Sequence, residues 1–383
     1  MKTSGIVLTA CAALSLAACA DRSPVAARAP DAAPLHAAAR GIDGQYVVVL
    51  NQGADPRSVA AAAGVSPRHV YTASLVGFSA ALNAGQLNAL RHNPNVAYVE
   101  QDQQVRAAAT QTGATWGLDR IDQAGLPLSG TYTYTATASN VNVYIIDTGI
   151  HVTHPQFGAR ATNVYDALGG TGADCHGHGT HVTGIIGSTT FGIAKGARLR
   201  GVRVLDCTGT GTVSGLIAAI DWVRLNHQPP AVAVIAVSVP YSAAVNAAAT
   251  SLVNAGVFTA AAAGNNNANA CNYSPGSAPA VMTTMASTST DARASYSNYG
   301  SCTDLYAPGT GITSTWLNGG TSTLSGTSMA AAHVAGVAAL YKSINTSASP
   351  ATMTTWIISN AIPNVITGNP AGTPNRLLNK NVL

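Results

Sequence analysis

The sequence Ser325-Gly326-Thr327-Ser328-Met329-Ala330-Ala331-Ala332-His333-Val334-Ala335-Gly336 places a serine directly after a glycine turn and at the start of a run of small residues. The run predicts a helix over residues 328–341. A serine in its first turn lies beside free backbone N–H groups and the positive end of the helix dipole, a place suited to a developing anion. A serine before an alanine-rich helix is also a common helix cap. Other segments of the sequence are therefore needed to distinguish a functional serine from a capping serine.

A second segment, Val141-Asn142-Val143-Tyr144-Ile145-Ile146-Asp147-Thr148-Gly149, predicts a buried strand that ends in a carboxylate. In parallel sheets the carboxyl ends of the strands form the edge at which ligands bind. Asp147 therefore stands where a functional acid is expected. An aspartate at a strand end can also serve a turn, so this segment alone does not decide.

A third segment, Asp174-Cys175-His176-Gly177-His178-Gly179-Thr180-His181-Val182, contains three histidines within six positions. One interpretation is a zinc hydrolase that uses His176, His178 and His181, because the spacing resembles the His-x-His-x-Asp-His motif of metallo-β-lactamases. Thr180 stands where that motif has its aspartate. The other interpretation makes His178 a general base that serves a serine and is held in the correct tautomer by an acid.

Asp147, His178 and Ser328 supply acid, base and nucleophile in the chain order of subtilisin. Four segments in the family's order resemble the subtilases, a family of serine endopeptidases. They are Ile146-Asp147-Thr148-Gly149, His178-Gly179-Thr180-His181, Ala262-Ala263-Gly264-Asn265 and Gly326-Thr327-Ser328-Met329-Ala330. Trp116-Gly117-Leu118 and Asn272-Tyr273-Ser274-Pro275 resemble the proteinase K-like branch, and the cysteine spacings resemble its aqualysin-type members.

The resemblance implies a broad endopeptidase in which neutral His178 takes the proton of Ser328 while Asp147 orients the ring. It implies that Asn265 donates its side-chain amide to the oxyanion, beside the backbone N–H of Ser328. Substrate is expected to bind as an added β-strand. By resemblance, its contacts are Gly209, Thr210 and Gly211 on one edge, Ser238, Val239 and Pro240 on the other, and Ala262, Ala263 and Gly264 in the first specificity pocket.

Two departures from the family pattern concern the substrate edge and the nucleophile helix. The edge at Ser238-Val239-Pro240 is about two residues shorter than the usual Ser-Leu-Gly-Gly-Gly, and a proline cannot donate a backbone hydrogen bond. This departure bears on pocket depth and substrate preference. Ala331-Ala332 replaces Thr-Pro after the nucleophile, a mild change because alanine favours helix.

The cysteines and several oxygen-bearing residues suggest disulfide bonds and calcium sites. Outside the N-terminal apolar segment the cysteines are Cys175, Cys207, Cys271 and Cys302, and an even number in an exported chain favours disulfides in any of three pairings. The resemblance implies Cys175–Cys207 and Cys271–Cys302. It also implies one or two structural Ca²⁺ sites. The first would use the carbonyls of Pro279 and Val281 and the carboxylate of Asp304, and the second Asp119, Asp122, Gln123, Ser129 and Thr131.

The N-terminal segment predicts export. Residues 1–20 are interpreted as a signal peptide, because their apolar run is too short to span a bilayer as a stable helix. Leu16-Ala17-Ala18-Cys19 resembles a bacterial lipobox with Cys19 lipidated, whereas Ala18-Cys19-Ala20 also fits ordinary cleavage before Asp21.

The rest of the chain predicts two folded units. Residues 21–43 are a predicted linker, and residues 103–108 a predicted processing linker. Residues 44–102 predict the order β-α-β-β-α-β, a ferredoxin-like α+β unit that resembles the family's inhibitory propeptide. Residues 109–383 predict a subtilisin-like α/β peptidase domain, a parallel sheet flanked by helices. Predicted strands are 141–146, 199–205, 231–237 and 257–262, and predicted helices are 178–186, 214–223, 243–254 and 328–341.

Composition and charge limit the partners. Charged residues make up 9% of the 383 residues, the net charge is +4, and no cluster of lysine and arginine predicts a nucleic-acid partner. The leading hypothesis is a secreted, monomeric zymogen that acts on proteins or peptides and is inhibited by its own propeptide. It would cut itself between residues 104 and 110, directly before Ala109. The alternatives are the zinc hydrolase and a non-catalytic binding protein that retains the fold.

Overall fold

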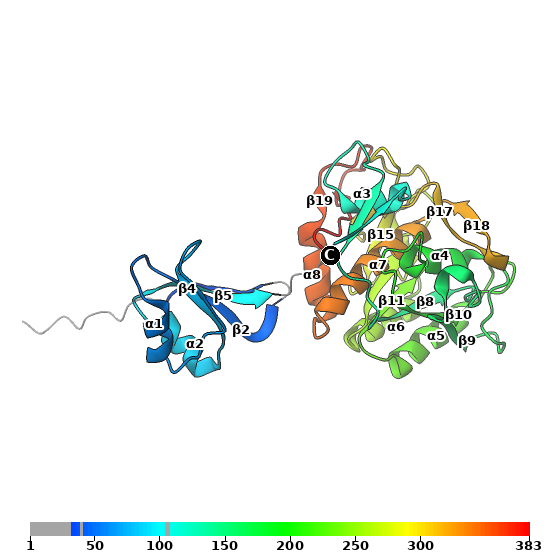
Figure 1. Cartoon of the computed structure of the whole chain (residues 1–383). Coiled ribbons are helices and arrows are strands. Elements are labelled where there is room, and N and C mark those ends of the chain that lie inside the picture. Colours follow the sequence, from blue (N-terminus) through cyan, green and yellow to red (C-terminus); the bar gives the residue numbers. More distant parts are fainter. Residues whose placement is uncertain (1–31, 39–40, 104–107) are drawn as a thin grey trace, which may run out of the picture. The chain divides into compact units, whose positions relative to one another are not determined.

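The computed structural model describes residues 32–38, 41–103 and 108–383, and these residues fall into two compact units, one before and one after residues 104–107 (Figure 1). The predicted signal peptide with Cys19 lies outside the described residues, as do residues 104–107 of the predicted processing linker. Among the described residues, no helix combines the length and the apolar character needed to cross a bilayer.

The N-terminal unit is a five-stranded sheet with the strand order β1-β5-β2-β4-β3. Its elements are β1 (Leu35–His36), β2 (Gly41–Leu50), α1 (Pro56–Ala62), β3 (His69–Tyr71), β4 (Gly77–Ala81), α2 (Ala84–Arg91) and β5 (Val96–Gln103). Side-chain caps start both helices: Asp55 accepts from Ser58 N, and Asn83 forms a capping box with Gln86. From β2 to β5 the elements follow the predicted ferredoxin-like order.

The predicted linker over residues 21–43 is wrong at its C-terminal end. β1 pairs in parallel with β5, with Leu35 opposite Val99, and β2 already begins at Gly41. Ala33 explains part of this difference, because it packs into the core of the unit and its N–H donates to the carbonyl of Arg91 at 2.6 Å. A single buried alanine beside a two-residue strand is too short to produce a periodic pattern of apolar residues in the sequence.

The C-terminal unit is built on a nine-stranded sheet with the order β19-β20-β16-β15-β13-β11-β8-β10-β9. Its helices are α3 (Trp116–Asp122), α4 (His178–Gly187), α5 (Val213–Asn226), α6 (Ala243–Asn254), α7 (Thr327–Ile344) and α8 (Pro350–Asn360), with short 3₁₀ helices at Pro155–Phe157, Ala270–Asn272 and Leu317–Gly319. The strands of the large sheet are β8 (Asn142–Asp147), β9 (Ala161–Asp166), β10 (Arg198–Arg203), β11 (Ala231–Ile235), β13 (Phe258–Ala262), β15 (Met282–Ser287), β16 (Leu305–Pro308), β19 (Ile362–Pro363) and β20 (Arg376–Leu377). Three small sheets pair β6 (Ala109–Thr112) with β7 (Thr131–Tyr134), β12 (Val239–Pro240) with β14 (Tyr273–Ser274), and β17 (Ile312–Thr315) with β18 (Thr321–Leu324).

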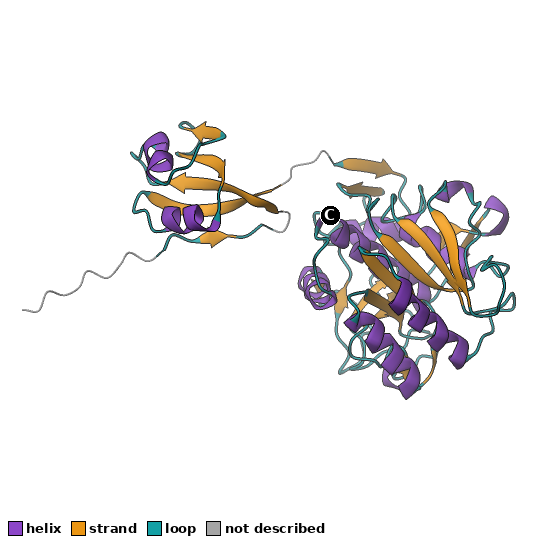
Figure 2. Cartoon of the chain, turned by 90° about the horizontal axis from the view of Figure 1, so that it is seen from below, coloured by secondary structure: helices purple, strands orange, loops and turns teal. Residues whose placement is uncertain are grey.

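Helices cover both faces of the large sheet (Figure 2). α4, α7 and α8 share one hydrophobic core with one face, and α5 and α6 share a second core with the other. α7 is buried from Thr327 to Lys342, and its small side chains let the helix approach the sheet closely. Within the large sheet, β8, β9, β10, β11, β13, β15 and β16 run parallel, so their carboxyl ends lie at one edge. The predicted strands and helices of this domain are confirmed.

β9, β15, β16 and α8 were not predicted from the sequence. In β15, Thr283 and Thr284 are buried although they are polar, and the Thr283 hydroxyl donates to the carbonyl of Gly276 at 2.8 Å. A buried threonine whose hydroxyl is satisfied in this way hides a strand from any search for apolar runs.

Candidate active site

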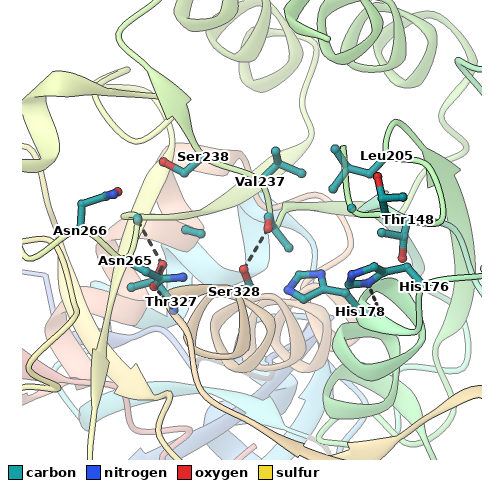
Figure 3. Close-up of a pocket in the computed structure, with 15 residues that line it drawn as sticks. Thr148, His176, His178, Leu205, Val237, Ser238, Asn265, Asn266, Thr327 and Ser328 are labelled. Atoms are coloured by element: carbon teal, nitrogen blue, oxygen red, sulfur yellow. Dashed lines mark hydrogen bonds between the residues drawn. The ribbon is translucent and has the colours of Figure 1, made fainter. Parts of the chain in front are cut away.

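Asp147, His178 and Ser328 come from three elements that meet at the carboxyl edge of the sheet. Asp147 is the last residue of β8, His178 the first of α4, and Ser328 the second of α7. His178 and Ser328 line a cavity of about 380 Å³. In this cavity Ser328 lies between Asn265 and His178 (Figure 3).

The histidine is held by the aspartate. Nδ1 of His178 lies 2.8 Å from both carboxylate oxygens of Asp147, whose side chain is fully buried, whereas 23% of the His178 side chain is exposed. Burial of the ring lowers its pKa, but the charge and hydrogen bond of Asp147 and the charge of Asp174 outweigh this, so the pKa of His178 lies above its ordinary value. The pair therefore favours a proton on Nδ1 and stabilises the imidazolium.

The serine stands at a helix N-terminus. Its backbone N–H belongs to the first turn of α7, where N–H groups have no acceptor four residues earlier in the helix. Its hydroxyl donates to the carbonyl of Ala236 at 2.9 Å in this resting arrangement (Figure 3). The side chain has to turn from Ala236 to reach His178.

Asn265 is oriented by the residue before the serine. Its Oδ1 accepts from the backbone N–H and the hydroxyl of Thr327, each at 2.9 Å. Because only the carbonyl oxygen of an amide can accept these bonds, Nδ2 is the atom left to act as a donor at the cavity.

The predicted substrate contacts divide into two groups. Gly209, Ser238, Ala262 and Gly264 line the cavity. Thr210 is tied into its own loop, since its N–H donates to Oδ1 of Asp206 at 3.0 Å and its carbonyl accepts from Asp206 N at 2.9 Å. Of the other predicted contacts, Gly211 bridges to Leu205 and Ala263 N–H donates to the carbonyl of Thr284, whereas Val239 and Pro240 form β12 and lie opposite Ser274 and Tyr273 of β14.

The three histidines do not converge as the zinc interpretation requires. Nε2 of His181 lies 3.0 Å from the carbonyl of Ile312 and 3.1 Å from that of Ser322, and burial lowers the pKa of His181 to about 4. The ring of His176 lies beside that of His178, with 6.4 Å between centroids. Over the part of the chain that the structure describes, no three histidine, cysteine or acidic residues form a metal-binding group. The zinc interpretation is therefore not supported.

The first predicted calcium ligands lie together. Pro279, Val281 and Asp304 line a cavity of about 220 Å³. Burial raises the pKa of Asp304 to about 6, although the N–H of Thr283 donates to its carboxylate at 2.7 Å. A buried carboxylate facing a hollow with carbonyl-bearing neighbours fits a hard cation.

The second predicted set also gathers, but its carboxylates already have partners. Asp119 accepts from the N–H and hydroxyl of Ser129, at 3.2 and 2.9 Å, and from Gly130 N. Asp122 pairs with Nζ of Lys380 at 2.7 Å. Gln123 Oε1 accepts from Ser129 N at 3.1 Å, and the hydroxyls of Ser129 and Thr131 lie 2.8 Å apart. This arrangement satisfies the acids without a cation and fits calcium less well than the first set.

The predicted disulfides are confirmed, with Cys175 bonded to Cys207 and Cys271 to Cys302. The first joins the loop before His178 to the loop that carries Gly209, so it ties the segment of His178 to one wall of the cavity. Sequence reasoning gave no role to Thr327 and Asp174, whose contacts orient Asn265 and the start of α4. Their signals were the position directly before the serine and an acid shortly before a predicted helix.

Comparison with known proteins agrees with this geometry. The subtilase family model matches residues 138–380, and the peptidase inhibitor I9 model matches residues 45–108. The chain is 44% identical over 403 residues to an extracellular serine proteinase of Thermus sp. (strain Rt41A), covering 97% of this chain and 96% of the relative. It is 43% identical over 304 residues to proteinase R of Parengyodontium album, covering 77% and 78%.

A solved structure, that of a cold-adapted subtilisin-like serine proteinase, is 45% identical, with a TM-score of 0.69 over 70% of this chain and 99% of that chain. The family match spans more than half of the chain, and the Thermus relative aligns over nearly all of it. This chain therefore belongs to the subtilase family of serine endopeptidases and carries an I9 inhibitor segment ahead of its peptidase domain.

Proposed function

We propose that Ser328 is the nucleophile, His178 the general base and Asp147 the orienting acid of peptide-bond hydrolysis. The observation that supports this most directly is the contact of His178 Nδ1 with both Asp147 oxygens at 2.8 Å, beside a cavity that Ser328 also lines. With the proton on Nδ1, Nε2 is left as the acceptor for the serine proton.

The reaction follows from this arrangement. Oγ of Ser328 bonds to the substrate carbonyl carbon as Nε2 of His178 accepts the hydroxyl proton, and negative charge collects on the carbonyl oxygen. The backbone N–H of Ser328 and Nδ2 of Asn265 donate to that oxygen. The C–N bond then breaks as His178 returns its proton to the leaving amine. Water then attacks the acyl carbon as the same histidine accepts its proton, and the C–Oγ bond breaks as the histidine returns that proton to Ser328, which frees the carboxylic acid product.

Substrate binding is proposed along the two edges that continue from the cavity. Ser238 leads directly into β12, whose partner on one side is β14. Tyr241 N–H donates to the carbonyl of Asn272 at 2.8 Å, and antiparallel pairs alternate between bonded and unbonded positions. The peptide groups of Pro240 therefore face away from β14, toward an added strand, and this position offers an acceptor but no donor.

The N-terminal unit is proposed to act on the peptidase domain. The match of residues 45–108 to an inhibitor family supports a zymogen in which residues 44–102 inhibit until they are degraded. We propose that the chain cuts itself between residues 104 and 110, directly before Ala109, and that residues 109–383 work as a monomer. The names of extracellular relatives support secretion, with residues 1–20 as the signal and Cys19 either lipidated or removed before Asp21.

Calcium is proposed as a structural ligand of the first set, held by Asp304 and the carbonyls of Pro279 and Val281. The cavity they line and the raised pKa of Asp304 support it. A bound cation would favour the ionised carboxylate and stabilise the folded state by mass action. It lies outside the reaction steps above.

The test is intact mass and N-terminal sequencing of the full chain beside its Ser328→Ala variant. We expect only the wild type to lose its first hundred or so residues, and only the wild type to react with a fluorophosphonate probe. Trimming of both chains alike, together with probe labelling of the variant, would overturn the assignment of Ser328. Labelling of neither chain by the probe would favour a non-catalytic protein.

A further inference from the structure

Asp174 lies four residues before His178 and is buried, with 6% of its surface exposed. Its carboxylate accepts five hydrogen bonds. Oδ1 accepts from the Thr148 hydroxyl at 2.9 Å, His176 N at 2.9 Å and Gly177 N at 2.8 Å, and Oδ2 accepts from Thr180 N at 2.9 Å and the Thr180 hydroxyl at 2.6 Å. Buried polar groups are as a rule hydrogen-bonded, and both oxygens of this buried carboxylate are satisfied by donors from the protein.

These donors belong to the two segments that carry the acid and the base. Thr148 directly follows Asp147 at the end of β8, and its hydroxyl also accepts from Gly179 N at 2.8 Å. The remaining donors surround His178 in the loop and first turn of α4. Asp174 therefore joins the strand end that holds Asp147 to the helix start that holds His178.

The helix start needs such a partner. Gly177, the N-cap of α4, has no side chain and adopts φ of 104°, a conformation that favours glycine. Asp174 takes the place of a capping side chain by accepting the N–H of Thr180 in the first turn. The negative charge also lies at the positive end of the helix dipole.

The charge of Asp174 acts on the His178 ring as well. All five donors are uncharged hydroxyl or backbone groups, so no cation among them neutralises the carboxylate. The titratable groups around His178 are Asp147 and Asp174, which favour its imidazolium, and His176 and His181, whose rings lie nearby. Asp174 is thus the second carboxylate that stabilises the charged ring.

We propose that Asp174 is a positioning residue, which fixes the first turn of α4 so that His178 faces both Asp147 and Ser328 and which stabilises the imidazolium formed during the reaction. This rests on the proposed function of His178 as general base. If the first turn of α4 is no longer held in place, kcat falls. If the negative charge of Asp174 is removed, the pKa of His178 and with it the midpoint of the pH profile shift to lower pH.

The experiment compares matured wild type with Asp174→Asn and Thr180→Val, measuring kcat/KM on one peptide substrate from pH 5 to 9. Asp174→Asn removes the charge, so we expect the midpoint of the acid limb to fall by about 1 pH unit and kcat to fall about 10-fold. Thr180→Val removes one hydrogen bond to Asp174, together with the acceptor of His151 N, but keeps the charge. It should lower kcat and leave the midpoint where the wild type has it.

An unchanged midpoint in Asp174→Asn would overturn the proposal, even if kcat fell, because a merely structural residue predicts that result. If Asp174→Asn does not fold, Asp174→Glu and Asp174→Gln have equal length and differ in charge, and the Gln variant must show the lower midpoint. The Ser328→Ala variant separates the two claims: if it retains full activity, the proposed function fails, whereas an inactive Ser328→Ala with an unmoved Asp174→Asn midpoint rejects only the role of Asp174.

Discussion

Thr327 donates two hydrogen bonds to a single atom, Oδ1 of Asn265, from its backbone N–H and from its hydroxyl, both at 2.9 Å. The same hydroxyl accepts from Gly264 N at 3.0 Å. The residue before the serine thus joins the Gly264–Asn265 segment to the start of α7. The donor end of the Asn265 amide is oriented before substrate arrives, which is the condition under which an oxyanion donor is most effective.

Asn265→Ala should lower kcat by about 10²–10³ with little change in KM, the magnitude known for the corresponding kind of donor in subtilisin, a member of the same family. Asn265→Asp keeps an oxygen that can accept from Thr327 but has no donor, so its kcat should fall at least as far. Steady-state kinetics on a peptide amide measures both. The prediction fails if Asn265→Ala keeps more than about half of the wild-type kcat.

Activity should rise with pH as His178 loses its proton. The ring acts as a base only when neutral, and its pKa is raised above the ordinary value of about 6.5, so the acid limb of kcat/KM should have its midpoint above that pH. The pH profile of matured enzyme on an uncharged peptide measures this. A rate that stays flat down to about pH 4 would contradict the assignment of His178 as base.

Pro240→Ala should improve binding of substrates long enough to reach β12. The variant restores a backbone N–H that points away from β14, and one added hydrogen bond is worth about 0.5–1.5 kcal/mol, or about 2- to 10-fold in KM. A matched pair of substrates, a dipeptide amide and a tetrapeptide amide with the same residue at the cut, provides the control. Equal improvement on both substrates would show that the change acts through something other than strand pairing.

Asp304→Asn should remove one bound calcium ion and change how stability depends on calcium. Burial raises the pKa of Asp304 to about 6, so without a cation the folded state holds the proton of this carboxyl more tightly than the unfolded state does. The stability that this tighter binding contributes is present at low pH and is lost as pH rises from about 4 through 6. At pH 8 in chelator the variant should therefore melt at or above the wild-type temperature. With calcium at 100 times its Kd, wild type should gain about 2.7 kcal/mol that the variant does not.

Calorimetry on enzyme blocked by a fluorophosphonate avoids self-digestion in this experiment. Asp119→Asn, the same acid-to-amide change at the second predicted calcium set, is the control. The calcium proposal at the first set is rejected if Asp304→Asn binds as many ions as wild type.

Much of the peptidase domain could be predicted because its central elements carry local signals. β8, β11 and β13 are apolar runs buried on both faces, and α7 is a run of small residues after a glycine, so periodicity and composition identify them. β15 could not be found in this way, because its buried threonines interrupt the apolar run and only the folded structure shows that their hydroxyls are satisfied by backbone carbonyls. The pairing of β1 with β5 likewise depends on a contact between residues far apart in the chain.

By itself, the sequence determined which residues are the candidates for the chemistry: Asp147, His178, Ser328 and Asn265 stand in motifs whose order and spacing identify the family. Only the tertiary structure decided how they are held. The bond from Thr148 to Asp174, the orientation of Asn265 by Thr327 and the pairing of β12 with β14 join segments that no local pattern connects. The physical reason is that hydrogen-bond partners at a buried site are chosen by proximity in the folded chain, whereas motifs and periodicity record only what is near in sequence.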